Sequence, residues 1–210
     1  MYLKFCGNDR ANLGVWLIKS TVWVILFLGL TACGIQRIPQ QKNQVEAAMA
    51  ELTNQYKRRA DLIPNLVNVV KGYASHEKET LESVLNARAK ATQVQINPNK
   101  LTAEDVAKFN QTQNELSQAL GRLLMITENY PNLKADTQFR DLMAQLEGTE
   151  NRVTVARQRL IESIKEFNNL VTVFPTNVTN AIFFKYEKMP QWDVTIDEKQ
   201  KIESPPEVKF

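Results

Sequence analysis

The sequence predicts an all-α protein, an elongated antiparallel up-and-down four-helix bundle behind an N-terminal membrane-targeting segment. Its 210 residues include only 7 Gly and 8 Pro, which favours long regular elements over many turns. The middle of the chain is rich in helix formers and lacks alternating β-branched runs. Its apolar residues recur every three or four positions, and every seven over 139–170. The expected organisation is a signal peptide over 1–33, the bundle over 34–175 and an irregular tail over 176–210.

The first 33 residues have the features of a bacterial lipoprotein signal. Three basic residues precede a twelve-residue apolar run, T-V-W-V-I-L-F-L-G-L-T-A (21–32). As a helix this run covers roughly 18 Å, which is short of a hydrocarbon core of about 30 Å. Basic residues, a short apolar run and small residues in this order are typical of a secretory signal. The final L-T-A-C (30–33) resembles a lipobox, whose cysteine is acylated, for example with palmitate, and becomes the mature N-terminus.

Cys33 is therefore the predicted lipid-attachment site, and two or more acyl chains would anchor the protein stably. Gly34 follows it, where an Asp would favour retention at the inner membrane, so an outer membrane is mildly favoured where one exists. The main alternative is an uncleaved transmembrane helix that adds residues 15–18 and contains Lys19. The second alternative is that the apolar run is a buried segment of the protein core. Since Cys6 would leave with the signal, the mature domain would have no thiol, disulfide or cysteine metal site.

The first two predicted helices follow. Residues 36–60 carry a narrow apolar stripe with spacings of 4, 3 and 4. The D-L-I-P sequence at 61–64 predicts a break or sharp kink, with Asp61 as a candidate N-cap of a second helix over 62–91. The stripe of the first helix is Val45, Met49, Leu52 and Tyr56, and the apolar face of the second is Leu66, Val70, Tyr73, Leu81, Val84 and Leu85.

The third and fourth predicted helices have clearer boundaries. T-A-E-D (102–105) has the spacing of a capping box and predicts a helix from about 103 to 130, which Pro131 ends. Asp136 or Thr137 is expected to cap the fourth helix, and V-F-P (173–175) to end it. The fourth helix has a five-heptad coiled-coil pattern of Phe139, Leu146, Val153, Leu160 and Phe167, with Leu142, Thr149, Ala156, Ser163 and Leu170 three positions later.

Three stretches resemble the LemA family: K-R-R-A-D-L-I-P-N-L-V-N-V-V-K-G-Y-A-S-H-E (57–77), A-L-G-R-L-L-M-I-T-E-N-Y-P-N-L-K-A-D-T-Q-F (119–139) and L-E-G-T-E-N-R-V-T-V-A-R (146–157). The resemblance covers about 41–192, and the terminal P-P-E-V-K-F is also similar. It implies an extracytoplasmic or membrane-attached helical bundle, with no activity, since the family's biochemical role is unsettled. Members often have a short N-terminal transmembrane helix, and here a lipobox stands in its place. Some are encoded beside membrane proteases, which suggests a role in envelope maintenance.

No pattern of residues predicts catalysis, a metal or a cofactor. His76 is the only histidine and is expected on the surface at a helix end. There is no Glu-x-x-His pair, Gly-rich phosphate loop or nucleophile elbow. A net charge of +3 without a basic stripe gives no indication of nucleic-acid binding. The same charge gives no strong attraction to anionic lipid, so membrane contact is expected to come from the anchor.

Five charged residues are candidates for a structural or interaction role. Arg58, Arg59 and Asp61 are expected at a solvated helix end, with a ligand or lipid-headgroup site as the alternative. Glu150 and Arg157 lie beside the heptad seam, where an unpaired, partly buried charge would be costly. Glu150 is therefore expected to pair with Arg157, Arg58 or Arg59 and to fix the register of the helices; partner binding is the alternative.

The chain's last aromatic residues raise a question about its surface. Ile182, Phe183 and Phe184 are expected to pack onto the bundle; docking to a partner or a membrane surface is the alternative. Trp192 is expected to pack on a bundle end, and residues 199–210 to be disordered. Together these features predict a non-enzymatic, lipid-tethered scaffold or adaptor in the bacterial cell envelope, with its helical domain outside the cytoplasm and a protein partner. The alternative is a regulatory binding module for a membrane protease or transporter.

Overall fold

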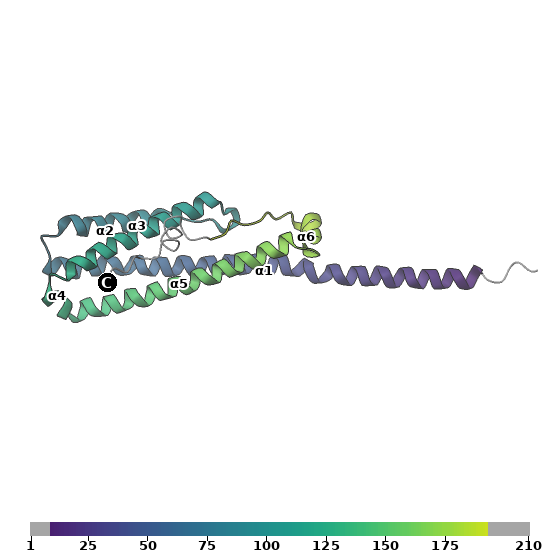
Figure 1. Cartoon of the computed structure of the whole chain (residues 1–210), viewed down its shortest axis with the longest axis horizontal. Coiled ribbons are helices and arrows are strands. Elements are labelled where there is room, and N and C mark those ends of the chain that lie inside the picture. Colours follow the sequence, from purple (N-terminus) through teal and green to yellow (C-terminus); the bar gives the residue numbers. More distant parts are fainter. Residues whose placement is uncertain (1–8, 193–210) are drawn as a thin grey trace, which may run out of the picture. The chain divides into compact units, whose positions relative to one another are not determined.

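The computed structural model describes the backbone of residues 9–192 and the side chains of Thr21, residues 35–98 and residues 100–192. Over this part of the chain the regular elements are helical and none is a strand, so the predicted all-α class is confirmed (Figure 1). In chain order they are α1 (Asp9–Tyr73), α2 (Lys78–Gln93), the 3₁₀ turn η1 (Pro98–Lys100), α3 (Ala103–Thr127), α4 (Pro131–Ala135), α5 (Thr137–Thr172), α6 (Thr176–Thr179) and the π-helical turn η2 (Asn180–Phe184).

The chain divides into two compact units. Unit 1 contains residues 1–42 and 167–188, and unit 2 contains residues 43–166 and 189–210. The helices α1 and α5 each contribute residues to both units.

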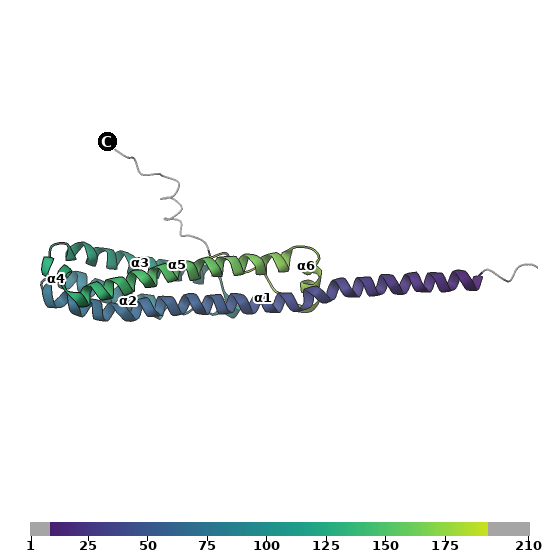
Figure 2. The same cartoon turned by 90° about the horizontal axis from the view of Figure 1, so that it is seen from below.

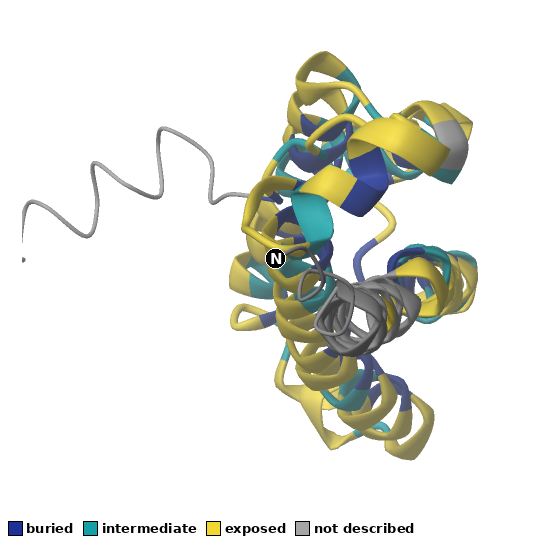
Figure 3. Cartoon of the chain, turned by 90° about the vertical axis from the view of Figure 1, so that its right-hand side faces the viewer, coloured by how far each residue is buried: buried dark blue, intermediate teal, exposed yellow. Residues whose placement is uncertain are grey.

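The core of unit 2 is formed by the apolar faces of its helices. Buried and exposed residues alternate around each helix, as amphipathic sequences require (Figure 3). The predicted stripe of Val45, Met49, Leu52 and Tyr56 is buried throughout. The main core cluster contains Ile63, Leu66, Val67 and Val70 from α1, Ala74 from the turn that follows it, Leu81, Val84 and Ala91 from α2, Leu116, Ala119, Leu120 and Leu123 from α3, Leu133 from α4, and Phe139, Leu142 and Leu146 from α5.

The predicted break at 61–64 is wrong, because α1 continues through Pro64 to Tyr73. Proline has no N–H, so Pro64 leaves the carbonyl of Ala60 without its normal helical donor. Arg88 of α2 supplies a substitute, since its Nε donates to the Ala60 oxygen at 2.6 Å. Asp61 therefore lies inside a helix and is not an N-cap. The compensation comes from a residue 28 positions away, so the local sequence could not reveal it.

A chain reversal lies where the sequence predicted continuous helix over 62–91. Helix α1 ends at Tyr73 and α2 begins at Lys78, which packs α2 against α3 (Figure 2). The Ala74 amide donates to the Val70 carbonyl at 2.8 Å, and the Glu77 amide to the Ala74 carbonyl at 3.1 Å. The reversal buries Leu81 and Val84 but leaves Tyr73 and Leu85 exposed, contrary to the predicted apolar face. His76 lies exposed in this turn, as expected.

The boundaries of α3 and α5 follow the predicted caps. The capping box is present: the Asp105 amide donates to Thr102 Oγ1 at 3.1 Å and the Thr102 amide to Asp105 Oδ2 at 3.2 Å. Helix α3 ends at Thr127, before the predicted 130, and Pro131 opens the short α4. Asp136 Oδ1 accepts from the Phe139 amide at 2.9 Å and so caps α5. The five first-position residues of the heptad pattern are all buried.

Unit 1 contains a hydrogen-bonded C-terminal turn. The Asn180 side chain donates to the Tyr186 carbonyl at 2.9 Å and accepts from the Tyr186 amide at 3.0 Å. The Tyr186 ring stacks on Phe184 and lies under Lys42 Nζ, which is 5.0 Å from the ring centroid. Ile182 and Phe183 do not pack inward as expected, since they are 64% and 62% exposed.

Several N- and C-terminal predictions lie outside the described residues. They include the side chain of Cys33, which carries the lipid-attachment prediction, and residues 199–210. The described backbone of α1 starts at Asp9, and the boundaries of the predicted domains stay predictions. Within the described part of the chain, no helix combines the length and apolar character needed to cross a membrane.

Candidate functional site

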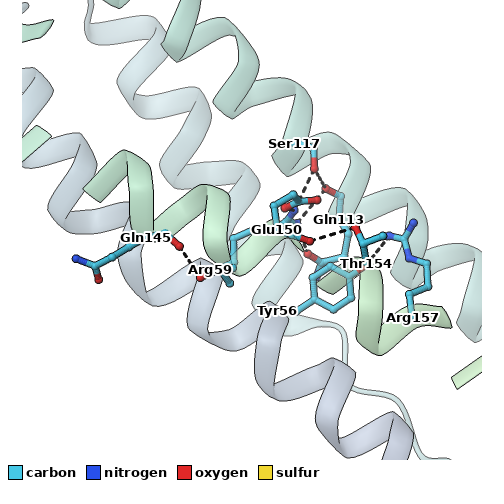
Figure 4. Close-up of polar contacts among 9 residues, drawn as sticks. Tyr56, Arg59, Gln113, Ser117, Gln145, Glu150, Thr154 and Arg157 are labelled. Carbon is cyan, nitrogen blue, oxygen red and sulfur yellow. Dashed lines mark hydrogen bonds and ion pairs between the residues drawn. The ribbon is translucent and has the colours of Figure 1, made fainter. Parts of the chain in front are cut away.

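A buried arginine on α1 forms the centre of the candidate site in unit 2. Arg59 is 2% exposed. It follows Leu52 and Tyr56 on the inward stripe of α1, at the spacing that places residues on one helical face. An arginine thus takes a position where the pattern would otherwise place an apolar side chain, and it points toward α3 and α5 (Figure 4).

The Arg59 guanidinium joins three helices. Its Nη1 donates to Glu150 Oε2 of α5 at 2.8 Å and to Ser117 Oγ of α3 at 3.2 Å. Its Nη2 donates to Gln113 Oε1 of α3 at 2.7 Å. The predicted pairing of Glu150 with a basic residue is therefore confirmed, and Arg59 is the partner.

Burial is divided unequally within this ion pair. The Arg59 side chain is 3% exposed and the Glu150 side chain is 52% exposed, so Glu150 is not partly buried as expected. Glu150 keeps much of its hydration, whereas Arg59 gives up water for three side-chain acceptors. Charge-assisted hydrogen bonds of this kind offset the cost of burying a cation.

Aromatic rings extend the site along one side of Arg59. The guanidinium carbon is 5.2 Å from the centroid of the Tyr56 ring, within cation–π range. The Tyr56 hydroxyl accepts from Arg157 Nη2 of α5 at 2.7 Å. Tyr56 packs edge-to-face on Phe109 of α3, and Phe109 on Trp192, with centroid distances of 5.1 and 5.7 Å. Trp192 is 2% exposed, so it does pack against the helices of unit 2.

The predicted charged group of residues 58–61 does not form one site. Arg59 points inward, whereas Arg58 and Asp61 are exposed on α1. Asp61 instead lies 3.9 Å from Arg88 Nη2 of α2.

A cleft of about 600 Å³ lies next to this network. It is bordered by Tyr56, Lys57, Asp61, Arg88 and Gln113, among residues of α1, α2, α3 and the segment 94–96. Small-molecule sites have volumes in this range. Two of the polar groups at its wall have internal partners: Arg88 Nε donates to the Ala60 carbonyl, and Gln113 Nε2 donates to the Ala91 carbonyl at 3.3 Å.

Sequence reasoning missed Gln113 and Arg88. Gln113 had a signal, since it lies at helical spacing between Phe109 and Leu116 on an otherwise apolar stripe. Pro64 inside a helical pattern was the corresponding signal for Arg88, because an internal proline needs a donor from elsewhere. In the part of the chain that the structure describes, no group of three or more His, Cys, Asp or Glu residues is placed to hold a metal ion.

The groups with a shifted pKa, Tyr73, Asp105, Tyr130 and Asp136, lie at helix ends. The Phe139 amide, followed by the Tyr73 hydroxyl at 2.8 Å, lowers the pKa of Asp136, and the hydrogen bond to Asp136 raises the pKa of Tyr73. The Thr102 hydroxyl and amide lower the pKa of Asp105. The lowered pKa values of Asp105 and Asp136 reflect their roles as helix caps, whereas burial and then Glu77 raise the pKa of Tyr130. None of these groups belongs to the Arg59 network.

The family model of the LemA family matches residues 48–210. The chain belongs to the LemA family. No curated protein matches the chain. The matched region of this LemA family protein contains Arg59 and each of its side-chain partners, so the network lies inside the family's shared part of the chain.

Proposed function

We propose that this LemA family protein is a non-enzymatic, lipid-tethered scaffold or adaptor in the bacterial cell envelope. The observation that carries the proposal is the set of bonds made by Arg59, whose two Nη groups bind Glu150, Ser117 and Gln113 of neighbouring helices. The buried polar groups at this centre hold helices together, as a rigid body that presents surfaces to partners requires.

The architecture that we infer is an up-and-down four-helix bundle made from the C-terminal part of α1 together with α2, α3 and α5. The shared apolar core of these helices supports it. So does the burial of Thr149 and Ala156 on α5, because small residues at these positions let a neighbouring helix approach closely. In this arrangement Glu150 and Arg157 fix helix register through Arg59 and Tyr56.

The tether is supported by the sequence of the N-terminus. L-T-A-C at 30–33 follows an apolar run that is too short to span a bilayer comfortably. We expect acylated Cys33 to begin the mature chain, with the helical domain outside the cytoplasm. Mass spectrometry of the N-terminal peptide from isolated membranes tests this. An intact Met1 with free thiols at Cys6 and Cys33 would overturn it in favour of an uncleaved transmembrane helix.

The scaffold role is tested by crosslinking intact cells and purifying the full chain from membranes. We expect several envelope proteins to be retained, at amounts below one per chain. A single membrane protease or transporter retained in stoichiometric amount would instead identify a regulatory binding module. A chain that retains no protein after crosslinking would refute both roles.

A further inference from the structure

Exposed apolar side chains are concentrated in unit 1. Among the described residues, ten large apolar side chains are exposed, and six of them belong to this unit. Five come from one short segment: Val173 (55% exposed), Phe174 (78%), Val178 (47%), Ile182 (64%) and Phe183 (62%). We call these five residues the apolar face. Single exposed apolar residues are common, but five of them between residues 173 and 183 favour an interaction surface.

The part of the apolar face that contains Ile182 and Phe183 is held in a defined conformation. The two hydrogen bonds between the Asn180 side chain and the Tyr186 backbone close the turn that carries Ile182 and Phe183. Lys185 adopts a left-handed conformation (φ 54°), and its amide donates to the Asn180 carbonyl at 2.7 Å. Phe184 stacks on Tyr186, while the two residues before it stay exposed. The exposure is therefore a property of a closed turn.

The described side chains of unit 1 have a different balance of charge from residues 43–166. Its described side chains include four basic residues, Arg37, Lys42, Lys185 and Lys188, and one acidic residue, Glu187. Residues 43–166 contain 16 residues of each sign. The near-neutral total therefore conceals a local excess of positive charge beside the apolar face.

The C-terminal turn of unit 1 contacts a part of α1 that lies shortly after the predicted anchor at Cys33. Lys42 contacts Tyr186, and both views place α6 beside α1 (Figures 1 and 2). Residue 42 is nine positions after Cys33, or about 14 Å at helical rise. The headgroup layer on each side of a bilayer extends several ångströms beyond the hydrocarbon. A tethered chain whose first helical turns lie along the membrane surface therefore brings this part of unit 1 to the lipid headgroups, because only about 14 Å of helix separates it from the anchor.

We propose that the apolar face, with the nearby Lys185 and Lys188, docks onto the anionic phospholipid surface of the membrane that holds the tether. This inference rests on the proposed tether. Apolar side chains that enter the interface and cations that meet anionic headgroups are the two contributions that bind proteins to membrane surfaces. A second copy of the chain would not require the local positive charge, and adducts to it are the competing outcome of the test.

The test uses the full chain reconstituted in liposomes with p-benzoylphenylalanine at position 183, a group that crosslinks to neighbouring C–H bonds on illumination. The control carries the same group at Met125, which is 67% exposed in unit 2. In vesicles of phosphatidylcholine with phosphatidylglycerol, we expect phospholipid adducts at position 183 and few at position 125. Mass spectrometry of the peptides identifies the adducts.

Charge variants test the electrostatic part. Each cation near an anionic surface contributes about a fivefold factor in binding, so neutralising Lys185 and Lys188 together should lower the docking equilibrium about 25-fold. Lys185→Gln with Lys188→Gln should therefore reduce the adduct yield at position 183, and so should vesicles of phosphatidylcholine alone. Lys90→Gln, an exposed cation of unit 2, should leave the yield unchanged.

Flotation of the same vesicles separates the two proposals. Chains that float with the vesicles but give no lipid adduct at position 183 refute docking and leave the tether intact. Adducts to protein only, or equal lipid adducts at 183 and 125, also refute docking. Chains that do not float refute both the tether and docking.

Discussion

The contact between Arg88 and the Ala60 carbonyl predicts a measurable coupling between Arg88 and Pro64. In α1, Pro64 removes the donor for that carbonyl, and Arg88 Nε replaces it at 2.6 Å. Hydrogen bonds from a charged donor contribute about 1.5–3 kcal/mol. Because the Arg88 side chain is 31% exposed, we expect the lower part of this range, about 1.5 kcal/mol, to be lost in Arg88→Met.

The stability cost of Arg88→Met should be smaller when Pro64 is replaced by alanine. An alanine at this position restores the N–H, so the Ala60 carbonyl gains its normal helical partner. The single variant should be more stable than the wild type, by up to about 3 kcal/mol, the cost of an internal proline. In its background Arg88→Met should cost less than about 0.5 kcal/mol, which leaves a coupling of about 1 kcal/mol.

Urea unfolding of the four detergent-solubilised full chains, followed by far-UV circular dichroism, measures the coupling at constant m-value. Lys90→Met is the matched control, because Lys90 is an α2 cation whose ion pair with Glu115 is on the surface. It should cost under about 1 kcal/mol and be additive with Pro64→Ala. If Arg88→Met is equally additive, within about 0.3 kcal/mol, Arg88 does not compensate for the proline and the reasoning fails.

Three further predictions concern the Arg59 network, the C-terminal segment and acid stability. Arg59→Met should destabilise unit 2 by about 1–3 kcal/mol in urea unfolding, because buried acceptors lose their donor. Glu150→Gln should lower the stability by only about 1 kcal/mol, because the Glu150 side chain is half exposed. A larger loss for Glu150→Gln than for Arg59→Met would contradict the unequal burial of the pair. Trp192→Ala should cost about 3–5 kcal/mol, and unchanged stability would show that Trp192 does not pack on Phe109. The pKa of Asp136 is lower in the folded state, so its contribution is present above the unfolded value of 3.8 and is lost as pH falls through the folded value. Asp136→Asn keeps a capping residue but removes this titration, so the loss of stability between about pH 5 and pH 3 should be smaller; an equal loss would locate the acid sensitivity elsewhere.

The sequence predicts the helices of this protein well where the signal is local. The capping box at Thr102 and Asp105 and the cap at Asp136 involve residues three positions apart, so both could be recognised in the sequence. The heptad positions from Phe139 to Phe167 are buried because a helix with this period has only one apolar face to bury. These features depend on nearest neighbours along the helix.

The features that could not be predicted depend on tertiary contacts. Pro64 stays inside a helix because Arg88 reaches it from α2. The reversal after Tyr73 has no proline or Asn-Gly pair to mark it, and it forms because α2 packs against α3. The choice of Arg59 over Arg58 and Arg157 as the partner of Glu150 depends on which guanidinium the packed helices bring to the Glu150 carboxylate, and sequence spacing alone left all three open.

The exposure of Glu150 gives the interior of unit 2 a sensitivity to dissolved ions. Arg59 is sealed from water, but the carboxylate that balances its charge is half in solvent, where salt screens charges over about 8 Å at physiological ionic strength. Dissolved ions have little access to the buried Arg59 guanidinium, but they can approach the exposed Glu150 carboxylate and weaken its electrostatic attraction to Arg59. The contact between α1 and α5 should therefore loosen as external salt rises, which lets a buried junction respond to the ionic composition of the surrounding medium.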